Sequence, residues 1–118
     1  MRARKSSKRL TSDDARLLLL ALPGVEEGPC YGTPGWRVKK RFLARLKEDG
    51  ETLVVKVGDE ERDILLAADP EVFFLTPHYF GYPTVLIRLP KIRKPLLAEV
   101  LQRAWRRLAP KGLLERAT

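Results

Sequence analysis

Residues 36–57 read WRVKKRFLARLKEDGETLVVKV, and this stretch decides the fold because apolar and basic side chains alternate along it. The alternation begins at Trp36, breaks near Lys40-Arg41 and then resumes. A period of two residues is typical of half-buried β-strands. Asp49-Gly50 is a strong signal for a two-residue type I′ turn. The stretch therefore predicts antiparallel strands with one apolar face and one basic face.

Two further segments predict strands. Residues 84–89 (TVLIRL) alternate in the same way, with Arg88 on the basic side. Residues 24–35 are rich in Gly and Pro, which is typical of turns, and they leave room for one short strand around Cys30 to Thr33.

Helix signals flank these strands. Thr11 or Ser12 can cap a helix that ends at Pro23-Gly24. Residues 58–70 begin with acidic residues, as a first helical turn favours, and PEVFF at 70–74 extends that helix by one turn. A last helix follows Pro95, with an apolar half and a polar, mostly basic half, and ends before Pro110.

The order of these elements predicts an α+β fold, an antiparallel sheet with helices packed on one face. A length of 118 residues and a hydrophobic content of 44% fit one globular domain. We expect a flexible basic arm at residues 1–10, a single domain at 11–112 and a C-terminal tail at 113–118.

Composition also bounds the setting of the protein. The single cysteine cannot form an internal disulfide, which favours a reducing, cytoplasmic location. No apolar run approaches the ~20 residues that a membrane span needs. The chain has no Asn, one Gln and many Arg, Lys and Glu residues, a composition that hints at a thermophilic source.

The net charge of +8 is unevenly distributed. Residues 37–47 hold six basic residues and no acidic one, whereas residues 48–71 hold nine acidic residues. Six bases fall on the side of the predicted strands that faces away from the core: Arg37, Lys39, Arg45, Lys47, Lys56 and Arg88. This face is either a platform for the phosphates of nucleic acid or a solvated face that confers solubility.

The basic arm offers a second set of phosphate contacts, as basic arms do in several DNA-binding folds. The arm bases are Arg2, Arg4, Lys5, Lys8 and Arg9. The alternative is a tail without a partner.

Residues 74–89 (FLTPHYFGYPTVLIRL) contain the only histidine, His78, together with several aromatic rings. Tyr79, Phe80 and Tyr82 could stack bases or line a ligand site, or they could pack a corner before the last strand. His78 has no serine nearby and no acid between Pro77 and Leu89, so catalysis would have to enlist Cys30. We expect His78 to pack among the neighbouring rings and the protein to be non-enzymatic.

Cofactor and metal motifs are absent from the sequence. It contains no phosphate-binding loop, dinucleotide fingerprint, H-E-x-x-H or C-x-x-C. The acidic run at 59–63 fits the first turn of a helix better than a cation site. We expect neither a cofactor nor a metal.

Three blocks of the sequence carry a family resemblance: ALPGVEEGPCYGTPGWRVKKRFLARL, AADPEVFFLTPHYFGYPTVLIRL and LLAEVLQRAWRRLAPKGL. Together they resemble the MmcQ/YjbR-like family over residues 12–112. The resemblance implies a CyaY-like or double-wing α/β sandwich and a protein that is predicted to bind DNA. It also implies that the block at residues 77–83 is an architectural corner, and it carries no catalytic residue over to this chain.

These observations lead to one expected function and two rivals. The expected function is non-enzymatic binding of nucleic acid, DNA in the first place, through the basic sheet face and the arm. The first rival is a protein-interaction or small-ligand module that uses the PHYFGYP loop, residues 77–83. The second is an enzyme that uses His78 with Cys30.

Overall fold

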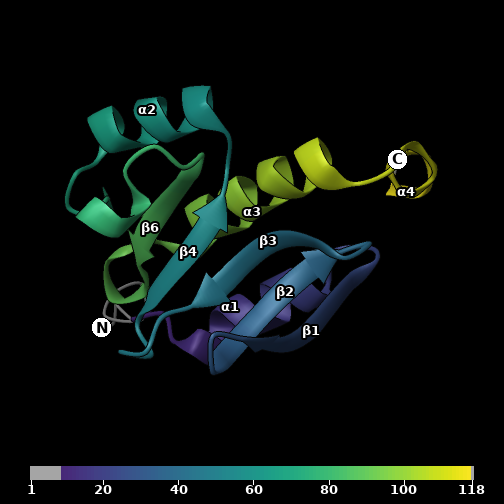
Figure 1. Cartoon of the computed structure of the whole chain (residues 1–118), viewed down its shortest axis with the longest axis horizontal. Coiled ribbons are helices and arrows are strands. Elements are labelled where there is room, and N and C mark those ends of the chain that lie inside the picture. Colours follow the sequence, from purple (N-terminus) through teal and green to yellow (C-terminus); the bar gives the residue numbers. More distant parts are fainter. Residues whose placement is uncertain (1–8, 118) are drawn as a thin grey trace, which may run out of the picture.

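The computed structural model describes residues 9–117, which form one antiparallel sheet with helices packed on one face (Figure 1). This arrangement confirms the predicted α+β class. The strands lie in the order β1-β2-β3-β4-β6-β5. Their bounds are Val25–Cys30 for β1, Thr33–Val38 for β2, Arg41–Leu46 for β3, Thr52–Lys56 for β4, Phe73–Phe74 for β5 and Thr84–Arg88 for β6.

Four α-helices and two 3₁₀ turns complete the fold. The helices are α1 (Ser12–Leu20), α2 (Asp59–Ala68), α3 (Lys94–Leu108) and α4 (Lys111–Ala117), and the 3₁₀ turns are η2 (Pro77–Tyr79) and η3 (Leu89–Lys91). Helices α1 and α3 lie behind the sheet, while α2 lies beyond one end of β4 and β6 (Figure 1). The opposite face of the sheet, hereafter the open face, carries no α-helix.

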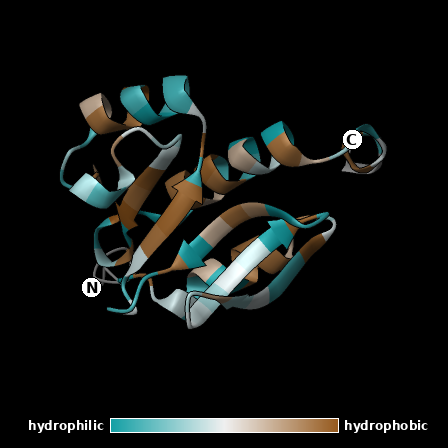
Figure 2. Ribbon diagram, in the orientation of Figure 1, coloured by the Kyte–Doolittle hydropathy of each residue, from teal (hydrophilic) through white to brown (hydrophobic). Residues whose placement is uncertain are grey.

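The main core lies between the sheet and α1 and α3. Trp36 and Trp105 are each 1% exposed, in agreement with their places on predicted apolar faces. Buried indole groups need partners, and both have one: Trp36 Nε1 donates to Glu27 Oε1 at 3.1 Å, and Trp105 Nε1 donates to the Pro23 carbonyl at 2.8 Å. Figure 2 shows that β4 and β6 are the most uniformly hydrophobic strands.

The predicted helices are confirmed, with small changes at their ends. Thr11 caps α1 in a capping box with Asp14. The expected extra turn at 70–74 is wrong, because Phe73–Phe74 pair with β6 as β5 instead. Residues 111–117, mostly assigned to the tail above, form α4, and its Leu113 is buried against Gly24.

The first hairpin differs from the prediction. Cys30 to Thr33 is not a short strand but the turn between β1 and β2, with Tyr31 and Gly32 at its centre. Pro29 and Pro34 face each other across this hairpin, and prolines count against a strand in a sequence pattern because they cannot donate to the ladder. The structure tolerates Pro29 because β1 is an edge strand.

Turn types also differ from the prediction. Type I′ turns need positive φ at both central residues, and this holds for Tyr31-Gly32 (55° and 82°) and for Lys39-Lys40 (50° and 71°). The expected type I′ turn at Asp49-Gly50 is wrong, because only Gly50 has a positive φ. There the Lys47 N–H donates to the Thr52 carbonyl around a four-residue loop.

The Asp49 side chain explains this longer loop. Its carboxylate accepts hydrogen bonds from the Glu51 N–H at 2.9 Å, the Thr52 N–H at 2.9 Å and the Thr52 hydroxyl at 2.7 Å. Burial opposes the charge, but these hydrogen bonds outweigh it and hold the pKa of Asp49 below its usual value. The aspartate therefore acts as a local cap and not as a residue in left-handed geometry.

Within residues 9–117, no helix is both long and apolar enough to cross a membrane.

The close approach of β1 and β2 predicts a specific cost for a methyl group at Gly35. A Cβ there would lie 2.6 Å from Cys30 Cβ, whereas a Cβ at Gly112 would meet no atom within 4 Å. We expect Gly35→Ala to lower the free energy of unfolding by about 1–3 kcal/mol. The matched control, Gly112→Ala, should leave it unchanged or raise it slightly. Urea unfolding of both variants measures the difference, and equal stabilities would contradict the packing described here.

Candidate functional site

A long loop covers part of the open face. Residues 75–83 connect β5 to β6, yet Tyr79 in this loop reaches Arg45 on β3. The loop therefore crosses β6 and β4. This crossing explains why Val54 and Leu86, which pair with each other on the open face, are fully buried.

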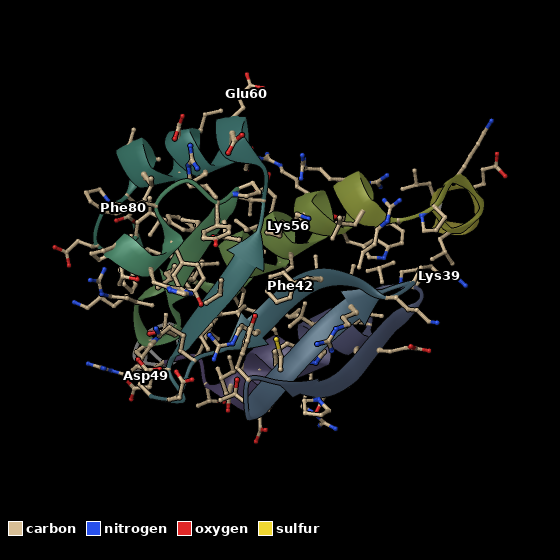
Figure 3. The ribbon with its side chains drawn as sticks, viewed as in Figure 1. Lys39, Phe42, Asp49, Lys56, Glu60 and Phe80 are labelled. Atoms are coloured by element: carbon tan, nitrogen blue, oxygen red, sulfur yellow. The ribbon has the colours of Figure 1, made fainter. Side chains whose placement is uncertain are left out.

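An open hollow of about 600 Å³ lies beside this loop. Its walls come from the β1–β2 turn, strands β2, β3 and β4, and the loop that precedes β6. Among residues 9–117, four basic residues line it, Arg37, Lys40, Arg45 and Lys56, and no carboxylate does. Its rings are those of Tyr31, Phe42, His78, Tyr79 and Tyr82. Figure 3 shows Phe42 and Lys56 over the middle of the sheet.

Arg45 organises the hollow from within. It is 6% exposed, and its guanidinium donates to the Tyr79 hydroxyl at 2.9 Å, to Glu48 Oε2 at 2.9 Å and to the Thr33 hydroxyl at 3.3 Å. Its Cζ lies 5.4 Å from the centroid of the Tyr31 ring. Burial works to lower the pKa of Arg45, but the contacts with Tyr79 and Glu48 outweigh it and raise that pKa. Arg45 is therefore a positioning residue with its terminal donors engaged.

The rings of the loop form one cluster. The Tyr79 ring lies edge-on to His78, with 4.8 Å between centroids, and 6.5 Å from the Tyr82 ring. Lys47 Nζ lies 5.7 Å from the Tyr79 centroid. Arg62 of α2 fastens the loop by donating to the Tyr82 carbonyl at 2.7 Å. The loop thus presents a fixed aromatic surface.

Only some of the basic residues that the sequence predicts on one face of the sheet line the hollow. Arg37, Arg45 and Lys56 line it, and Lys47 lies beside Tyr79. One expectation fails. Lys39 is in an exposed turn and not on the strand face, because the type I′ turn ends β2 at Val38 (Figure 3).

Arg88 lies on the expected side of the sheet, because it shares the open face with Leu86, but it does not line the hollow. Its guanidinium stacks on Phe74 at 3.9 Å and donates to the Pro70 and Glu71 carbonyls. It therefore ties β6 to the turn after α2, outside the hollow. Of the arm bases, Arg9 is exposed, while Arg2, Arg4, Lys5 and Lys8 lie outside the described residues.

The aromatic residues of the loop have different roles. His78 and Tyr82 are exposed and line the hollow, and Tyr79 lines it half-buried. Phe80 is 62% exposed and does not line it, so the prediction that His78 packs among all three rings holds only for Tyr79 and Tyr82.

Among the lining residues that no sequence pattern singled out are Tyr31, Lys40 and Phe42. Their positions depend on two type I′ turns and on a register shift between β2 and β3. Tyr31 and Lys40 hold positive φ values, which cost energy in residues other than glycine. Such backbone strain tends to occur at functional sites.

The hollow also contains the two residues that the enzyme hypothesis requires. Cys30, which is buried, and His78 both line it. Among residues 9–117, no three His, Cys, Asp or Glu side chains gather as a metal site would require. The arrangement of bases and rings is suited to binding an anion that carries a flat ring.

Comparisons with known proteins place the chain among relatives without an assigned function. The YjbR family model matches residues 20–107. An uncharacterised protein of Mycobacterium bovis and two of Mycobacterium tuberculosis are 36% identical over 123 residues, covering 89% of this chain and 93% of theirs. A crystal structure of a Deinococcus radiodurans protein with a DUF419 domain is similar, with a TM-score of 0.71 and 26% identity over 88% of this chain and 82% of that one.

The Arg45–Tyr79 hydrogen bond predicts unequal effects of removing two tyrosine hydroxyls. Tyr79→Phe removes an acceptor from a buried guanidinium, and we expect a loss of about 1.5–3 kcal/mol in the free energy of unfolding. Tyr82 makes no side-chain hydrogen bond within residues 9–117, so Tyr82→Phe should stay within about 0.5 kcal/mol of the wild type. Urea titrations of both variants measure this, and a neutral Tyr79→Phe would show that the bond contributes little.

Proposed function

The chain belongs to the YjbR family, and on that premise we propose that it is a non-enzymatic protein that binds nucleic acid on the open face of its sheet. The hollow is the centre of the proposed interface. The single observation that carries the proposal is the meeting of four basic residues with exposed rings in a hollow without a carboxylate.

The positive charge of the lining and the free donor groups of its basic residues support this proposal. Phosphate contacts by Lys and Arg supply most of the affinity of proteins for nucleic acid. Lys40 and Lys56 make no salt bridge within residues 9–117, so their ammonium groups are available for phosphates. Arg37 uses one nitrogen on the Pro29 carbonyl at 3.3 Å and keeps its other donors. Lys47 extends the basic surface past Tyr79.

The basic arm adds to the proposed interface. Residues 1–9 hold five bases and no acid. Leu10 is 8% exposed and packs into the main core, which attaches the arm to the domain. We propose that the arm supplies further phosphate contacts, which carry no sequence preference of their own.

We propose binding without catalysis because Cys30 is buried and makes no side-chain hydrogen bond to His78 within residues 9–117, although both residues line the hollow. His78 makes ring contacts with Tyr79 and Tyr82, and the hollow has no carboxylate to orient it. The single cysteine of the chain fits a cytoplasmic setting for this binding.

A small-ligand module is the second candidate. One observation favours it: a volume of about 600 Å³ lies within the usual range of small-molecule sites. The charge of the lining restricts such a ligand to an anion.

Salt dependence tests the proposal. Fluorescence anisotropy with labelled DNA should give a slope of log affinity against log salt of about −4 to −5 if about five phosphates are engaged. The double variant Lys40→Gln/Lys56→Gln should bind more weakly and flatten the slope by about 1–2.

A matched control removes the same charge elsewhere. Arg106 and Lys111 are exposed on α3 and α4, on the helical side of the sheet. Arg106→Gln/Lys111→Gln should leave the slope nearly unchanged. A flat salt response of the wild type, or equal losses in the two double variants, would refute the proposed interface.

A further inference from the structure

We propose that the hollow takes in one unpaired nucleotide, its base against the tyrosine rings and its phosphate at Lys40 and Lys56, so that the protein prefers single-stranded to double-stranded nucleic acid. This inference rests on the proposed function and names its substrate class.

The hollow exposes two tyrosine rings to solvent. Tyr31 is 86% exposed and Tyr82 is 54% exposed, and both line the hollow. Tyr31 lies over the Arg45 guanidinium, Arg45 bonds to Tyr79, and Tyr79 contacts Tyr82. The two exposed rings therefore lie on either side of the Arg45–Tyr79 hydrogen bond. Large rings left open to solvent beside a basic surface are typical of platforms on which bases stack.

The backbone that carries these two rings is held in place before any ligand binds. The loop carrying Tyr82 is held by Arg62, which is itself paired with Asp59 at 3.2 Å and Asp63 at 3.1 Å. Tyr31 is placed by a two-residue turn. Because neither ring needs to be ordered on binding, stacking on them costs little conformational entropy.

Other lining residues of the hollow also suit a bound nucleotide. Phe42, Pro83 and Thr84 line the hollow, and Phe42 and Pro83 offer apolar contact to a base. The side chain of Lys56, whose residue is the Cα partner of Thr84, lies next to it for a phosphate.

The structure of duplex DNA decides between the two forms of nucleic acid. In a duplex the faces of the bases are covered by their neighbours, so that a tyrosine ring can reach only edges and backbone. In a single strand each base can leave the stack and offer a face, with its phosphate one sugar away. A hollow lined by both rings and ammonium groups therefore suits a single strand better than a duplex.

The test compares probes and ring variants. Anisotropy is measured with a mixed-sequence single strand of about 12 nucleotides, with the matching duplex, and with a free nucleoside monophosphate as competitor. Tyr82→Ala and Tyr31→Ala remove rings of the hollow. Phe80→Ala removes an equally exposed ring of the same loop that does not line the hollow, and Tyr82→Phe keeps the ring without its hydroxyl. Circular dichroism verifies that each variant is folded.

The expected result is tighter binding of the single strand and a loss of about tenfold or more for Tyr82→Ala on that probe. Phe80→Ala and Tyr82→Phe should bind like the wild type, and duplex binding should change little in any ring variant. The free nucleoside monophosphate should compete only weakly. It offers one base and one phosphate, whereas a strand also contacts the protein through its neighbouring phosphates.

Three outcomes would overturn the inference, and they can be distinguished. Equal binding of duplex and single strand, with no effect of Tyr82→Ala but weaker binding of Lys40→Gln/Lys56→Gln, leaves the proposed function and removes the stacking site. Competition by the nucleoside monophosphate as strong as that by the strand assigns the hollow to a free nucleotide. No binding of any probe at low salt removes both the inference and the proposed function.

Discussion

The buried guanidinium of Arg45 is the constraint on which the open face depends. Burial of a charged group that is only 6% exposed is unfavourable unless most of its donors find acceptors. Both terminal nitrogens of Arg45 find them, whereas its Nε has no partner within residues 9–117. The acceptors come from the β2 strand through Thr33, from the end of β3 through Glu48 and from the long loop through Tyr79. One side chain therefore draws three segments together. The hollow exists because this network holds residues 75–83 over β4 and β6, leaving the neighbouring part of the sheet uncovered.

Within residues 9–117 no carboxylate lines the hollow, although Glu48 pairs with Arg45, and several other carboxylates are engaged elsewhere. In α2, Asp59 and Asp63 pair with Arg62, and Glu61 pairs with Arg103 of α3. Figure 3 shows Glu60 at the far side of α2 and Asp49 at the tip of its loop. Some bases outside the hollow thus have acidic partners, whereas Lys40 and Lys56 make no salt bridge within residues 9–117. The self-repulsion of the basic lining is offset when an anion enters.

The family relationship fixes the architecture but not the chemistry of the site. The Deinococcus radiodurans structure keeps the fold at 26% identity, with a TM-score of 0.71. A fold alone does not confer a function. The proposed binding of nucleic acid therefore depends on particular side chains: two lysines that make no salt bridge within residues 9–117, two exposed tyrosines and Arg45.

The sequence by itself determined the central strands, the three longer helices and the sidedness of the sheet, but not β1, β5 or α4. Alternation along residues 36–57, the cap at Thr11 and the amphipathic pattern after Pro95 are local signals. The structure agrees with the last two, and with the first except at the register shift that turns Phe42 toward the hollow. The sequence also predicted Arg37, Arg45 and Lys56 on one face, because side chains alternate strictly along a strand. Only the tertiary structure decided the hollow. The Arg45–Tyr79 bond joins residues 34 apart, and the left-handed turns at Tyr31-Gly32 and Lys39-Lys40 follow from the twist of the paired strands and not from local preference. Those long-range requirements placed Lys40 and Tyr31 at the site, and they moved Lys39 and Arg88 away from it.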